Sequence, residues 1–89
     1  MGIRLFIDGI PYFFTDQQLK ELFIPYGTVL SAEVAHDPRG RPLQFGYVEM
    51  AAPHEGNMAI QQLHRSRFHG RLLLVKFDKR DRTEPTSGV

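Results

Sequence analysis

The sequence predicts an α+β sandwich of the ferredoxin-like type, in which two helices cover one face of a four-stranded antiparallel sheet. Apolar residues alternate with polar ones over four segments and recur at helical spacing over two others, in the order βαββαβ. The length of 89 residues fits one domain with a single core. The other face of the predicted sheet is therefore open to solvent.

The first strand and the first helix are the clearest elements. β-Branched and aromatic residues alternate with others from Ile3 to Asp8, and Gly9 ends the pattern. A helix then begins with a capping box, because Thr15 offers an N-cap hydroxyl and Gln18 follows three residues later. The apolar side chains behind this box recur at helical spacing (Leu19, Leu22, Phe23 and Tyr26), and Pro25 and Gly27 end the segment.

Two further strands follow, with a turn between them. Residues 28–35 read as a strand that directs Val29, Ala32 and Val34 toward the core. Residues 36–42 are dense in turn formers and predict a hairpin tip. The third strand runs over residues 43–50, with Gly46, Val48 and Met50 on the covered face.

The last third of the chain predicts a helix, a connector and a strand. The helix begins near Pro53, which suits a first helical turn, and its inner face holds Gly56, Ala59, Ile60 and Leu63. Residues 64–70 form a connector, and the final strand covers residues 71–77. We expect the domain to span residues 1–80 and residues 81–89 to form a flexible charged tail.

Composition excludes several classes of protein. The chain has no cysteine, so disulfides and thiolate metal sites are excluded. No apolar run approaches the roughly 20 residues that span a bilayer, and the N-terminus lacks the features of a signal peptide, so we expect a cytoplasmic protein. The formal net charge is only +1. Basic residues nevertheless gather from Arg65 onward, where phosphates could be bound locally.

Three aromatic residues are predicted on the open face of the sheet. Leu5 and Ile7 must point at the helices, so Phe6 points away, and the same alternation sends Phe45 and Tyr47 outward. Folding gains nothing from rings in this position, and an exposed apolar patch usually marks an interaction site. Flat rings on a rigid sheet favour the stacking of unpaired bases.

Two segments resemble the signature motifs of the RNA recognition motif family. Leu5-Phe6-Ile7-Asp8-Gly9-Ile10 is similar to its six-residue motif, and Leu43-Gln44-Phe45-Gly46-Tyr47-Val48-Glu49-Met50 is similar to its eight-residue motif. The resemblance covers residues 3–78 and comes closest to small single-domain bacterial proteins of the cyanobacterial type. It departs from the usual pattern at Leu43, where Lys or Arg is usual, at Gln44, where Gly is usual, and at Met50, where an aromatic residue is usual.

The resemblance implies a non-catalytic domain that binds single-stranded RNA. Phe6 and Tyr47 would stack on successive bases, and Phe45 would pack against a ribose. The other residues expected at the site are cations, acids and apolar neighbours of these rings: Arg4, Asp8, Arg39, Arg41, Leu43, Glu49, Leu74, Lys76, Lys79 and Arg80. Arg39 and Arg41 lie on the predicted hairpin tip and would restore the charge that Leu43 lacks.

Other interpretations of the same face stay open. Leu43 and Leu74 make it more apolar than RNA stacking needs, which favours a protein-interaction or dimerisation module as the alternative, and single-stranded DNA is an alternative ligand. Acylphosphatases share the element order, but the loop after the first strand has no arginine and the only asparagine is Asn57. The four histidines show no metal-binding spacing, so we expect no metal, no cofactor and no enzyme activity.

Overall fold

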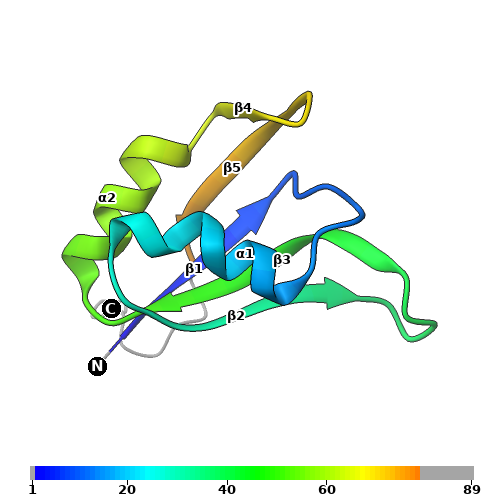
Figure 1. The fold of residues 1–89 in the computed structure, drawn as a ribbon, viewed down its shortest axis with the longest axis horizontal. Coiled ribbons are helices and arrows are strands. Elements are labelled where there is room, and N and C mark those ends of the chain that lie inside the picture. The colour runs from blue at the N-terminus through cyan, green and yellow to red at the C-terminus, as the bar shows by residue number, and fades with distance from the viewer. Residues whose placement is uncertain (1, 79–89) are drawn as a thin grey trace, which may run out of the picture.

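The computed structural model describes residues 2–78, and the predicted tail at residues 81–89 lies outside them. Figure 1 shows two helices packed on one side of a twisted sheet. The elements are β1 (Ile3–Asp8), α1 (Asp16–Phe23), the 3₁₀ helix η1 (Ile24–Tyr26), β2 (Val29–His36), β3 (Pro42–Met50), α2 (Pro53–Leu63), β4 (Ser66–Phe68) and β5 (Arg71–Phe77). The sheet order is β2-β3-β1-β5-β4, and neighbouring strands are antiparallel. This architecture confirms the predicted fold.

The structure adds one strand to the four that were predicted. Residues 66–68, expected to lie in a connector, form the short edge strand β4 and pair with the start of β5. His69 and Gly70 join the two strands with φ angles of 52° and 80°. Two consecutive positive φ angles between paired strands are typical of a tight type I′ hairpin turn. A histidine in the first of these positions gave no usual hairpin signal, so the strand was missed.

The core lies between the sheet and the helices. The largest fully buried side chains come from both strands and helices: Leu5, Ile7, Ile10, Leu19, Phe23, Val48, Met50, Leu73 and Val75. Of the predicted inner face of α2, Gly56, Ala59 and Leu63 are buried, and Ile60 packs against the core while partly exposed. The alternation predicted for β1 and β3 is therefore confirmed.

The predicted start and end of α1 are confirmed in detail. The Gln18 backbone N–H donates to the Thr15 hydroxyl at 3.1 Å, and the Gln18 side-chain carbonyl accepts from the Thr15 backbone N–H at 3.0 Å. This reciprocal pair satisfies two donors that a helix start would otherwise leave unpaired. At the other end, Pro25 lies in η1 and Gly27 ends it.

The side chains of β2 change faces at a bulge. Val29 pairs with Met50, but Ser31 pairs with Glu49, so Leu30 is an extra residue without an opposite partner. A bulge of this kind shifts the alternation by one residue. It explains why Val29 and the pair Ala32 and Val34 all pack on the core side although their spacing is three and then two.

Candidate nucleic-acid interface

The open face of the sheet presents three aromatic rings at its centre. Phe6 on β1 lies opposite Tyr47 on β3, and Asp8 lies opposite Phe45. The Phe6 ring centroid is 5.5 Å from that of Phe45 and 5.7 Å from that of Tyr47, and the Phe45 and Tyr47 centroids are 6.2 Å apart. All three rings are partly exposed. We call Phe6, Phe45 and Tyr47 the ring platform.

Cationic side chains lie over two rings of the platform. The Arg4 guanidinium carbon is 4.7 Å from the Tyr47 ring centroid, and the Lys76 ammonium nitrogen is 5.7 Å from that of Phe6. Arg4 is held by Asp78, since its Nε donates to Asp78 Oδ2 at 3.0 Å. Attraction between a cation and a ring face is worth about 0.5–1 kcal/mol at exposed sites. These contacts place positive charge beside the rings.

The remaining sheet residues expected at the site frame the platform. Asp8 lies at the end of β1 between Phe45 and Leu74, and its Oδ1 accepts from the Gly9 backbone N–H at 2.9 Å. Glu49 lies opposite Arg4, two residues beyond Tyr47. Leu74 is partly exposed between the buried residues Leu73 and Val75, so it faces the open side. The face therefore carries acids and apolar groups as well as cations.

The start of β3 is irregular, which affects Leu43. Pairing with β2 passes from Gly46 opposite Val34 to Pro42 opposite His36. Gln44 adopts a φ of 64°, and its carbonyl accepts from the Gly9 and Ile10 backbone N–H groups. Strict alternation along β3 is interrupted here, so the argument that put Leu43 on the open face does not apply, although Leu43 is exposed. A place for Leu43 at the site stays a prediction.

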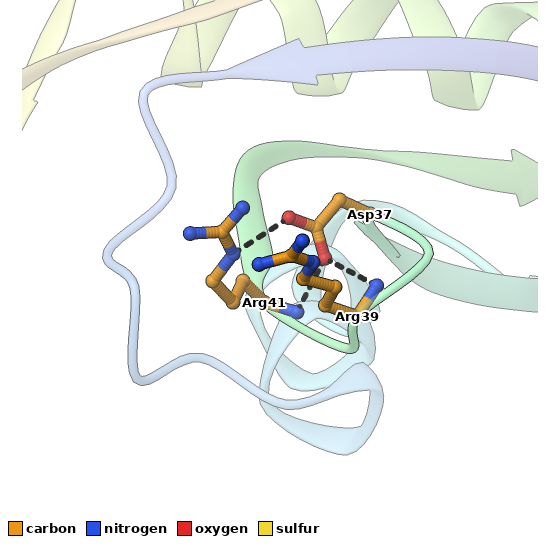
Figure 2. Close-up of polar contacts among 3 residues, drawn as sticks. All are labelled: Asp37, Arg39 and Arg41. Atoms are coloured by element: carbon orange, nitrogen blue, oxygen red, sulfur yellow. Dashed lines mark hydrogen bonds and ion pairs between the residues drawn. The ribbon is translucent and has the colours of Figure 1, made fainter.

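The two arginines at the β2–β3 hairpin tip differ in their contacts (Figure 2). The Arg41 Nε donates to Asp37 Oδ2 at 2.8 Å, while Asp37 Oδ1 accepts from the backbone N–H groups of Arg39 and Arg41. The hydrogen bond from the Arg41 backbone N–H, reinforced by that from its guanidinium, lowers the pKa of the Asp37 carboxyl. Asp37 therefore offsets much of the Arg41 charge, which the sequence did not predict.

Two of the predicted site residues, Lys79 and Arg80, lie outside the described residues. Phe13 is 49% exposed, next to the exposed Tyr12. Within residues 2–78, no group of three or more His, Asp or Glu side chains could hold a metal ion, and no helix is long and apolar enough to cross a membrane.

Residues 5–74 match the sequence model of the protein family described as the RNA recognition motif. The chain belongs to the RNA recognition motif family. Members of this family are binding domains rather than enzymes, so the acylphosphatase interpretation is set aside.

Several proteins of known identity are similar to this RNA recognition motif. It is 34% identical over 79 residues to the polyadenylate-binding protein, cytoplasmic and nuclear, of Eremothecium gossypii, covering 89% of this chain and 14% of that protein. It is 33% identical over 90 residues to the sex determination protein fox-1 of Caenorhabditis elegans, covering 97% of this chain and 21% of that protein. The chain thus spans only a small part of the length of these curated relatives.

Solved structures agree with this assignment. The crystal structure of the RNA-binding protein PG1 superposes with a TM-score of 0.83 at 33% identity, covering 86% of this chain and 94% of that chain. The structure of the Sex-lethal protein/RNA complex superposes with a TM-score of 0.80 at 26% identity, covering 85% of this chain and 47% of that chain.

Proposed function

We propose that this chain binds single-stranded RNA, with bases stacked on Phe6 and Tyr47 and a ribose packed against Phe45. The observation that carries the proposal is the grouping of three partly exposed rings, with centroids 5.5–6.2 Å apart, on the sheet face opposite the helices. Family membership supports it, as does the RNA complex formed by the similar Sex-lethal protein.

The cations around the platform would serve the phosphates. Lys76 and Arg4 lie over platform rings, so each would move aside when a base stacks on that ring and would then meet a phosphate beside it. We propose Arg39, Arg41, Lys79 and Arg80 for the phosphates farther along the strand. Asp8 and Glu49 would accept hydrogen bonds from exocyclic amines, and Leu43 and Leu74 would pack against the edges of bound bases.

The same proposal includes a cellular location, a subgroup of the family and two further binding partners. We propose a cytoplasmic role, which the name of the Eremothecium gossypii relative supports in part. The run from Gly46 to Met50 is the feature that supports a likeness to small bacterial members of the family, whereas the curated relatives named above are eukaryotic. Binding of single-stranded DNA and a weak homodimer through the apolar edge of the platform are further proposals.

The test is a titration of a labelled nine-nucleotide RNA of randomised sequence with the full chain and its variants. Each stacked base contributes roughly 1–3 kcal/mol, so Phe6→Ala and Tyr47→Ala should each raise Kd about tenfold or more. Met58→Ala is the matched control, because Met58 is a 48% exposed apolar residue on α2, away from the sheet face. Unchanged Kd values for folded Phe6→Ala and Tyr47→Ala proteins would refute the proposal.

A further inference from the structure

We infer that Tyr12, Phe13 and His69 form a second nucleobase-binding site beyond the end of the ring platform. The inference rests on the proposed function, because the base bound here would belong to the same RNA strand. Tyr12 and Phe13 lie in the loop between β1 and α1, and His69 lies at the tip of the β4–β5 hairpin. Figure 1 shows this loop and this tip at one end of the sheet, the end at which β1 finishes beside Phe45.

The rings of this site are open to solvent. Tyr12 is 68% exposed and Phe13 is 49% exposed, and His69 is exposed as well. A ring with both faces covered could not keep two-thirds of its surface exposed, so Tyr12 leaves a face available for stacking. Neighbouring exposed rings leave apolar surface in contact with water, and such patches mark interaction sites.

The exposed rings are nevertheless held in place. The Phe13 ring centroid lies 5.5 Å from that of Tyr12 and 5.4 Å from that of His69, both nearly perpendicular. Beneath them, Phe14 and Phe68 are 5.3 Å apart and pack against the core, and Phe68 also lies 4.5 Å from His69. Because side chains that are already ordered lose little entropy on binding, this arrangement favours capture of a flat ligand.

The backbone is shaped to bring the two segments together. Gly9 has a φ of 89°, and a Cβ atom there would lie 2.3 Å from the Leu72 carbonyl oxygen. Only glycine lets the loop leave β1 so close to the start of β5. His69 occupies a positive φ of 52° that glycine or asparagine would adopt at lower cost. In this position the His69 ring lies edge-on against Phe13.

The charge around the site favours a nucleic acid. Residues 56–77 contain Arg65, Arg67, Arg71 and Lys76 but no Asp or Glu. Arg67 lies opposite Leu72, and the alternation of β5 puts both on the same side as Leu74 and Lys76. Arg67 therefore continues the open face from the ring platform toward His69. Rings for bases beside cations for phosphates are the features by which proteins hold single strands.

The experiment compares a four-nucleotide and a nine-nucleotide RNA of randomised sequence, titrated with the full chain. Four nucleotides suffice to occupy the ring platform, and only the longer strand reaches both sites. Tyr12→Leu and Phe13→Leu keep apolar bulk but remove the ring. We expect each to raise Kd about tenfold for the nine-nucleotide RNA, the size of effect of losing one stacked base, and to leave Kd for the four-nucleotide RNA within about twofold. Tyr12→Phe should bind like the unchanged chain.

The other outcomes of this experiment distinguish failure of the second site from failure of the proposed function. If Phe6→Ala weakens both RNAs while Tyr12→Leu and Phe13→Leu bind the nine-nucleotide RNA normally, the ring platform stands and the second site is refuted. If Phe6→Ala weakens neither RNA, the proposed function itself has failed. If the leucine variants change only the sedimentation behaviour, the cluster is a protein contact and the inference is wrong. Thermal unfolding of each variant, with Met58→Ala as the control, shows that the fold is kept.

Discussion

Gln44 shows how one backbone angle connects the signature motif to the fold. Its φ of 64° lies in the left-handed region, where a side chain other than glycine costs about 1–2 kcal/mol. The Gln44 carbonyl accepts two backbone N–H groups from the turn after β1, so this conformation fixes the turn to the start of β3. The glycine that is usual in the family at this place therefore has a conformational reason, and Gln44 holds the same geometry at a cost.

Replacing Gln44 with glycine should therefore stabilise the domain. The gain should be about 0.5–1 kcal/mol in the free energy of unfolding, because relief of the left-handed strain exceeds the entropy that glycine adds to the unfolded chain. Urea unfolding of Gln44→Gly measures it. Gln44→Ala is the matched control, since it removes the polar side chain but keeps the Cβ atom. If both variants gain equally, the backbone angle is not the cause.

The first helix depends on the reciprocal hydrogen bonds at its start. Thr15→Ala removes the hydroxyl that accepts from the Gln18 backbone N–H, so about 1 kcal/mol of stability should be lost. In a domain of this size, that loss lowers the melting temperature by about 4–8 °C. Thr15→Ser keeps the hydroxyl and should melt close to the unchanged chain. Equal melting of Thr15→Ala and Thr15→Ser would show that the cap contributes nothing.

The β2–β3 hairpin tip carries a carboxylate, Asp37, that should weaken RNA binding by pairing with Arg41. Asp37→Asn keeps an oxygen that accepts from the Arg39 and Arg41 backbone N–H groups but removes the charge paired with the Arg41 guanidinium. We expect a Kd for RNA that is a few-fold lower at low salt. The plot of log K against log salt should steepen by about 0.7, the value for one more phosphate contact to a single strand. Asp37→Glu keeps the charge and should not steepen it.

Most of the helices and strands could be predicted from the sequence. Alternation, capping residues and prolines located β1, α1, β3, α2 and β5, because the signals are local. β4 was missed because its hairpin turn is built on His69, and its pairing follows from tertiary contact. The exposure of Phe13 could not be predicted, since it depends on how the β1–α1 loop meets the β4–β5 hairpin. The pairing of Asp37 with Arg41 was also missed, although the turn residues around it were recognised.

Across the whole molecule, stacking and charge should be separable contributions to binding. If each of the six cations proposed for phosphates makes one contact, the slope of log K against log salt should be about −4.2 for single-stranded RNA. Phe6→Ala should lower K at every salt concentration without changing this slope, because a ring releases no counterions. Titrations between 50 and 300 mM salt check this, with Lys76→Ala as the complementary variant that should flatten the slope. A shallower salt dependence for Phe6→Ala than for the unchanged chain would contradict the assignment of stacking to Phe6 and phosphate binding to Lys76.

The ion pair between Arg4 and Asp78 joins residues at the two ends of the described domain, and both lie outside the segment, residues 5–74, that matches the family. The Asp78 backbone N–H also donates to the Arg4 carbonyl at 2.9 Å, so the pair is clamped twice. The Arg4 guanidinium lies over Tyr47, which belongs to the eight-residue motif of the family. If Arg4 contacts RNA as proposed, two proteins with identical motifs would differ in ligand preference when they differ at residues 4 and 78, outside the segment that defines the family.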